Sequence, residues 1–234
     1  MNNTEYFARR CSSWNIVVAS SIALLVALML VVIMHHPVAR HTDAAELVTD
    51  IARQASSDRL VHGTLAVALT AMTSLMLGFA ARLGLARPHV MLGAVSTALA
   101  LVLICLAVLL DGFVAPAIAV RCITVGGNCA GEAQALLRFG GLQIEFMTRF
   151  GLYALTGATA LWASDLIIRN DRAWLPGLLG LASAALQLGV LVLGGSRLGV
   201  HNLTLFVGAQ ALWYLSVGAV ILFRQGPYAD NQVA

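Results

Sequence analysis

The sequence contains no lysine and few charged residues of any kind. All 14 basic residues are arginine, and charged residues make up only 11% of the 234-residue chain, against about 25% in a typical soluble domain. So few charges cannot cover a water-facing surface or follow a phosphate backbone. The composition therefore excludes a soluble enzyme, a disordered tail and a nucleic-acid-binding protein. The net charge of +3 is also too small to imply an acidic partner.

Cysteine is equally scarce. None of the four cysteines forms a C-x-x-C pair, which disfavours a thioredoxin-type motif or a zinc knuckle. Cys122 and Cys129 flank a short glycine-containing stretch. A disulfide between them requires an oxidising compartment, so the topology of the chain bears on this prediction. The alternative is two free thiols in a loop.

Long apolar runs, by contrast, are abundant. Hydrophobic residues make up 59% of the chain, and its mean hydropathy is +0.85. A helix needs about 20 mostly apolar residues to cross a membrane. Six stretches qualify, namely residues 14–34, 62–81, 90–110, 148–168, 174–193 and 202–223. They lack the strict alternation of a membrane β-barrel. We therefore predict an all-α polytopic membrane protein, with a single domain built as a bundle of six transmembrane helices.

The arginines predict the orientation of this bundle. Cytoplasmic segments are enriched in basic residues close to the spans. Both terminal segments and two very short turns hold seven arginines, and the longer opposite loops hold the other seven at lower density. We therefore expect an inner-membrane protein with both termini cytoplasmic. Residues 35–61 and 111–147 then form the two outer loops, and the cysteine pair lies in the second.

The outer loops show helical patterns of their own. Apolar residues recur at helical spacing over residues 43–55, and Thr42 or Asp43 could cap this segment. The pattern predicts a short amphipathic helix on the outer surface or over the mouth of the bundle. In the second loop, residues 132–138 are expected to extend the fourth span beyond the membrane.

Ionisable residues gather at the outer ends of the predicted spans. Such groups are costly near a membrane and usually face a bundle interior or a cavity. Imidazole together with carboxylate suits Cu, Zn, Fe or Mn, so these residues predict a transition metal site. The predicted ligands are His62, Asp111, Glu145 and His201, and the residues that could add ligands are His35, His36 and His41. The four predicted ligands come from four separate helices, and no linear motif such as H-E-x-x-H supports the set.

Two competing interpretations concern the same residues. Span-end residues commonly sit among lipid headgroups, and Glu145 with Arg149 has the i, i+4 spacing of an ion pair. His62 and His201 could instead be axial ligands of a haem b if their helices are neighbours. Both alternatives remain open at the level of sequence.

Asp111 is the strongest single candidate for a functional residue. Gly112 and Pro116 follow it, which predicts that the chain turns or continues as a broken helix. An acid at the end of a helix opposes the helix dipole. A partner such as His62 or Arg149 is therefore expected beside it.

Polar residues are sparse near the centres of the spans. Gln187 and Gln210 fall near the middle of the last two spans, where they are expected to hydrogen-bond across helices and stabilise packing. No charged residue falls at the predicted bilayer centre, which argues against a proton pump or a channel with a charged filter.

The leading functional hypothesis is an inner-membrane protein with a His/carboxylate site at its periplasmic mouth. The site would bind a transition metal or act on a small or lipidic substrate, and whether the protein is an enzyme is left open. The alternative is a non-enzymatic membrane subunit or small-solute carrier whose helices pack against partner proteins. The expected partners are membrane lipid and either other membrane proteins or further copies of the chain, with no nucleic acid.

Overall fold

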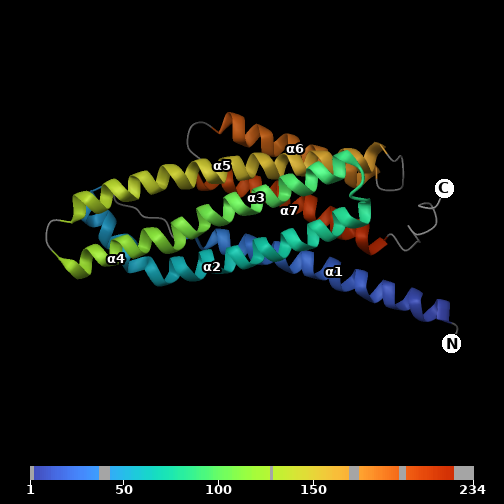
Figure 1. Ribbon diagram of the computed structural model, residues 1–234, viewed down its shortest axis with the longest axis horizontal. Coiled ribbons are helices and arrows are strands. Elements are labelled where there is room, and N and C mark those ends of the chain that lie inside the picture. The colour runs from blue at the N-terminus through green and yellow to red at the C-terminus, as the bar shows by residue number, and fades with distance from the viewer. Residues whose placement is uncertain (1–2, 37–42, 127–128, 169–173, 195–198, 224–234) are drawn as a thin grey trace.

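Seven α-helices and one short π-helix make up nearly all of the described part of the chain, which comprises residues 3–36, 43–126, 129–168, 174–194 and 199–223 of a computed structural model (Figure 1). In chain order the elements are α1 (Asn3–Met34), α2 (Ala44–Leu83), α3 (Pro88–Leu109), η1 (Leu110–Val114), α4 (Ala115–Val125), α5 (Ala130–Ile168), α6 (Trp174–Leu193) and α7 (Val200–Phe223).

Six helical segments in the described residues are long and apolar enough to cross a membrane. They are Ser13–Met34, Ala44–Leu83, Pro88–Val125, Ala130–Ile168, Trp174–Leu193 and His201–Phe223. The all-α prediction with six such helices is therefore confirmed. The helices differ greatly in length: α2 has 40 residues and α6 has 20. At 1.5 Å per residue α2 is about 60 Å long, twice the thickness of a bilayer hydrocarbon core.

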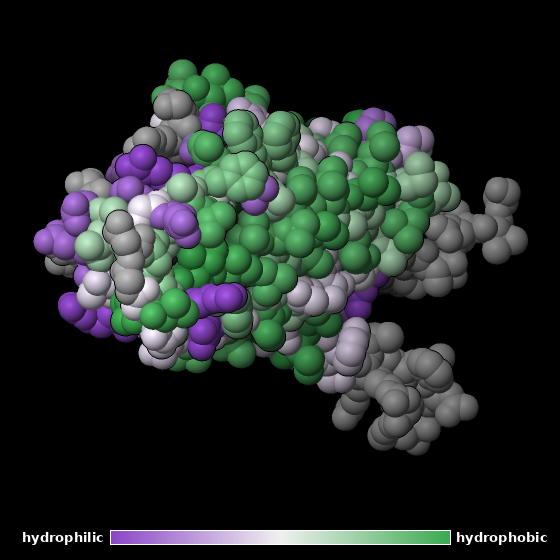
Figure 2. All heavy atoms as spheres, turned by 60° about the vertical axis from the view of Figure 1, so that its left-hand side comes forward, coloured by the Kyte–Doolittle hydropathy of each residue, from purple (hydrophilic) through white to green (hydrophobic). Residues whose placement is uncertain are grey.

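The helices run side by side, with the extra length gathered at one end of the bundle. Figure 1 shows that α2 and α5 begin, and α4 ends, at the same end, which we call the extended end; the first turns of α1 and the last turns of α7 lie toward the other end. Figure 2 shows apolar residues over the middle of the molecule and polar residues gathered on its left, around the extended end. This distribution is typical of a protein whose middle contacts lipid and whose ends contact water.

Two tryptophans form the centre of the main core. Trp162 and Trp213 are almost fully buried among side chains of α1, α2, α5 and α7. The indole of Trp162 donates a hydrogen bond to the Val90 carbonyl oxygen at 3.1 Å, which ties α5 to the start of α3. Gly93 lies directly against this indole, and any side chain there would collide with the ring. Small residues at such contacts allow membrane helices to approach closely.

A chain of hydrogen bonds joins the middle of α5, α6 and α7. Gln187 donates to the Gln210 amide oxygen at 2.7 Å, as the sequence predicted. The Thr156 hydroxyl donates to Gln187 at 3.1 Å, and the Thr159 hydroxyl donates to Gln210 at 3.3 Å. All four side chains are buried. Polar contacts in an apolar interior hold helices in one register.

The extended end has a small core of its own. Val48 of α2, Ala119 of α4 and Ala133 of α5 are buried together there. Cys122 and Cys129 form a close pair across the α4–α5 connection, with their Cα atoms 5.7 Å apart, which is within the range of a disulfide.

The two predicted outer loops are mostly helical. Residues 44–55 are helical, as expected, but they form the first turns of α2 rather than a separate helix lying on a surface. Asp43 caps this helix, since its carboxylate accepts hydrogen bonds from the amides of Ala45 and Glu46. Residues 130–138 likewise belong to α5. The apolar stripe of residues 44–55 packs against α4 and α5. As part of a long helix, this segment keeps its backbone hydrogen bonds and buries its apolar face in the same arrangement.

The chain does not turn at Asp111. It continues through the π-helix η1, from Leu110 to Val114, directly into α4. The cause lies at Pro116, which has no amide hydrogen to donate to the turn before it. A π-turn, which inserts one residue into the helix, accommodates the missing hydrogen bond. The predicted turn is therefore absent, and the predicted break is a π-turn within a continuous helix.

Candidate metal centre

His62 is the buried centre of a small polar cluster. It lies midway along α2, and its Nδ1 is 2.8 Å from the backbone carbonyl oxygen of Asp58, one turn earlier. Since a carbonyl oxygen only accepts hydrogen bonds, Nδ1 must carry a hydrogen. The neutral ring therefore presents a lone pair at Nε2. The sequence produces this arrangement locally, because residues four apart lie on one face of a helix.

Two further ligand atoms face this lone pair. His62 Nε2 lies 3.1 Å from Asp111 Oδ2 and 3.1 Å from His36 Nε2. The third side of the triangle, from His36 Nε2 to Asp111 Oδ2, measures 3.6 Å. The three residues come from different elements: His36 follows the end of α1, His62 belongs to α2 and Asp111 belongs to η1.

Gly112 allows this approach. A side chain at this position would overlap the Cβ and ring of His62. The residue beside Asp111 must therefore be glycine for η1 to lie this close to α2. The π-turn and Gly112 together explain why Asp111 reaches His62 from a helix that would otherwise pass at an ordinary distance.

The size of the triangle suits a transition metal ion. A triangle with sides of 3.1, 3.1 and 3.6 Å has a circumradius of about 1.9 Å, so an ion slightly out of its plane would lie about 2.0–2.2 Å from all three atoms. Those are the lengths of Zn²⁺ bonds to imidazole and carboxylate. His36, His62 and Asp111 could therefore hold a metal ion.

The electrostatics of the cluster favour a cation. Nε2 of His62 and the carboxylate of Asp111 are both acceptors, so they repel one another unless a proton or a metal ion lies between them. A fourth group, the carboxyl of Asp58, interacts electrostatically with His62, Asp111 and His36. Asp58 is not among the ligands predicted from the sequence; its position one turn before His62 is the signal that points to it.

The structure brings together only part of the predicted ligand set. His62 and Asp111 lie together, and His62 is the partner predicted for Asp111. His36, one of the additional candidates, joins them. Glu145 and His201 lie outside this group: Glu145 lies 3.6 Å from Arg149 in the predicted ion pair, and His201 is exposed at the start of α7. His35 Nδ1 instead contacts the Val31 carbonyl oxygen. His41 lies outside the described residues.

The haem alternative receives no support from this geometry. An axial ligand needs a free imidazole nitrogen directed at the iron. The haem also needs a second ligand on a neighbouring helix, but α7 packs mainly against α1 and α6, and its His201 is exposed at the start of the helix. We therefore do not propose a haem.

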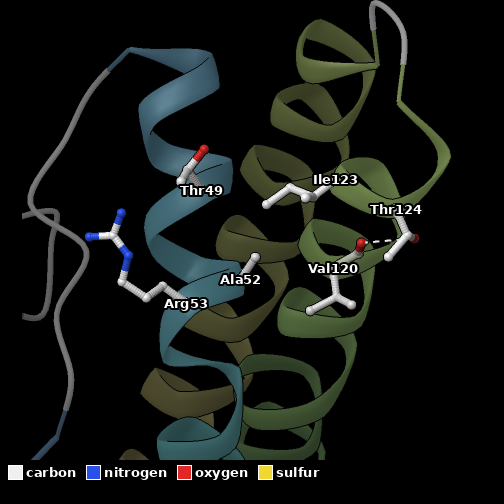
Figure 3. Close-up of a pocket in the computed structure, with 6 residues that line it drawn as sticks. All are labelled: Thr49, Ala52, Arg53, Val120, Ile123 and Thr124. Atoms are coloured by element: carbon white, nitrogen blue, oxygen red, sulfur yellow. Dashed lines mark hydrogen bonds between the residues drawn. The ribbon is translucent and has the colours of Figure 1, made fainter.

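A groove at the extended end is a separate feature. Thr49, Ala52 and Arg53 of α2 face Val120, Ile123 and Thr124 of α4 across it, and the Arg53 guanidinium points away from α4 (Figure 3). The only hydrogen bond among these residues that Figure 3 marks runs from the Thr124 hydroxyl to the Val120 carbonyl of the same helix. The lining offers no His, Cys or carboxylate, so the groove does not compete with the cluster as a metal site.

Comparisons with protein families, with curated proteins and with solved structures found no significant match to this chain.

Proposed function

We propose that the protein binds a divalent transition metal ion at the outer side of a membrane, through His36, His62 and Asp111. The observation that carries the proposal is the triangle of ligand atoms, 3.1, 3.1 and 3.6 Å on its sides. Two imidazoles with one carboxylate are a donor set of zinc and of non-haem iron sites. Copper and manganese accept the same ligands.

The proposed membrane location rests on the six apolar helices and on the arginines. The bundle would lie in an inner membrane with both termini in the cytoplasm and with its apolar middle in contact with lipid. Arginine density at the short turns supports this orientation. The extended end, and the metal cluster that lies between it and the apolar middle, would then face the periplasm.

Metal content of the purified protein tests the proposal. We expect about one ion of Zn²⁺, Fe²⁺, Cu²⁺ or Mn²⁺ per chain after loading and desalting in detergent. His36→Ala, His62→Ala and Asp111→Asn should each weaken binding at least about tenfold, because each removes one of three ligands. Elemental analysis and a metal titration measure this directly.

Two matched controls separate a specific site from general histidine or carboxylate binding. His201→Ala and Glu145→Gln change the same residue types outside the cluster, and both should bind metal like the unchanged protein. Thermal unfolding in detergent checks that every variant is folded. Unchanged protein without bound metal, or a loss in His201→Ala but not in His36→Ala, would contradict the proposal.

A further inference from the structure

We infer that the bound metal keeps at least one coordination position open, and that this position takes a small oxygen or nitrogen donor carrying no more than one negative charge. The inference rests on the proposed metal site and describes what that site can bind. On this inference an exogenous ligand can reach the ion, so the site is not a closed structural site.

The number of protein ligands indicates an open coordination position. In the described part of the chain the cluster contains three residues, each offering one ligand atom. Structural zinc sites use four protein ligands, whereas zinc sites that bind substrate use three and leave the fourth position to water or another ligand. Iron bound by two histidines and one carboxylate likewise keeps open positions. Two histidines and one aspartate therefore leave at least one coordination position open on either zinc or iron.

The unequal burial of the ligands gives the direction of the opening. The side chain of His62 is 4% exposed, whereas those of His36 and Asp111 are 31% and 41% exposed. The protein thus covers the cluster on the side of α2 and leaves it accessible beside His36 and Asp111. A ligand would approach the ion from that accessible side.

The charge of the cluster limits the ligand. A divalent ion with the Asp111 carboxylate has a formal charge of +1, and the carboxylate of Asp58 beside it brings the local total to zero. The groups that act on Asp58 among the described residues are His62, Asp111 and His36, and none of them is an arginine. The described groups that act on Asp58 thus supply no fixed positive charge to favour a phosphate dianion, whereas water, a carbonyl, a carboxylate or azide carries little enough charge to bind.

Cobalt substitution with azide as the probe tests the inference. Co²⁺ replaces Zn²⁺ in sites of this kind and absorbs visible light with an intensity that depends on its coordination. Azide added to the Co²⁺-loaded protein should change this spectrum saturably, and sulfate at the same ionic strength should not. Asp58→Asn should tighten azide binding about fivefold, since it removes a neighbouring negative charge. Glu145→Gln, a carboxylate change outside the cluster, should leave the azide affinity unchanged.

The possible results separate the two proposals. Co²⁺ that binds with full stoichiometry but whose spectrum ignores azide would overturn the open position and leave metal binding intact. A response to sulfate as strong as that to azide would overturn the limit on charge. Failure of Co²⁺ and of Zn²⁺, Fe²⁺, Cu²⁺ and Mn²⁺ to bind would overturn the proposed function and this inference together. His62→Ala, which should show neither the cobalt spectrum nor the azide response, ties the signal to the cluster.

Discussion

At the scale of single residues, the candidate site depends on a glycine as much as on its ligands. Gly112 lies against the side chain of His62, and it stands next to Asp111 in a π-turn. A glycine inside a helix normally destabilises it by about 1 kcal/mol relative to alanine. Here that cost allows two helices to bring a carboxylate and an imidazole to 3.1 Å. Glycine at position 112 is thus explained by the close approach of η1 to α2 and not by helix propensity.

Gly112→Ala should therefore weaken metal binding although it alters no ligand. The new methyl group would push η1 away from His62 and displace Asp111, and we expect a loss of about 10- to 100-fold in metal affinity, as for other residues that position ligands. The matched control is Gly63→Ala, beside His62 on α2, where the new Cβ would meet only Phe113 at an ordinary 3.7 Å. Metal titration of both variants measures the difference. Equal affinities in the two variants would refute the role of Gly112.

At the scale of helices, buried amides define how α5, α6 and α7 pack. The bonds from Thr156 to Gln187 and from Gln187 to Gln210 cross two helix interfaces in an otherwise apolar region. An apolar surface alone allows helices to rotate or slide, because lipid is as apolar as the side chains. A hydrogen bond between two amides is satisfied in one arrangement only.

Gln187→Leu should lower the free energy of unfolding by about 0.5–2 kcal/mol, because the buried amide oxygen of Gln210 loses the hydrogen bond from Gln187. The double variant Gln187→Leu/Gln210→Leu should be less destabilised than the sum of the two single variants, since both members of the pair are then apolar. Denaturant unfolding in detergent measures these differences. Gln143→Leu, at an exposed position of α5, serves as the control. Strict additivity would show that the two amides do not interact.

At the scale of the whole molecule, the long helices place a folded extension at one end of the bundle. α2 and α5 continue well beyond the length that a bilayer requires, and α4 packs between them. The Cys122–Cys129 pair lies at the tip of this extension. If the extension faces an oxidising compartment, the pair forms a disulfide that stabilises the connection by about 2–3 kcal/mol.

Thiol labelling of intact cells tests both the orientation and the disulfide. A membrane-impermeant maleimide should label Cys129 only after reduction, and it should not label Cys11 near the N-terminus, because that residue is proposed to lie in the cytoplasm. A Cys122→Ser variant should expose Cys129 to the reagent without reduction. Labelling of Cys11 from outside would reverse the proposed topology. Labelling of Cys129 before reduction in the unchanged protein would instead argue against the disulfide alone.

The general fold could be predicted from the sequence because it depends on composition and local pattern. Six runs of apolar residues are enough to predict six helices, since a backbone in lipid must satisfy its hydrogen bonds within each segment. The pairs Glu145–Arg149 and Gln187–Gln210 were also accessible, the first from i, i+4 spacing and the second from depth in the span. The helical pattern of residues 43–55 was visible. Its continuity with the next span was not predicted, although no proline or glycine between them stops a helix.

The membership of the metal cluster, by contrast, was decided only by the tertiary structure. The sequence alone does not show which ionisable groups at one end of the spans meet, so Glu145 and His201 stood beside His62 and Asp111 as candidates. Which of them meet depends on which helices are neighbours, on the π-turn before Pro116 and on the close contact at Gly112. These are properties of packing between segments 26 and 49 residues apart. The sequence thus determined that histidines and carboxylates gather at one end of the predicted spans, and the packing of α1, α2 and η1 brought His36, His62 and Asp111 together.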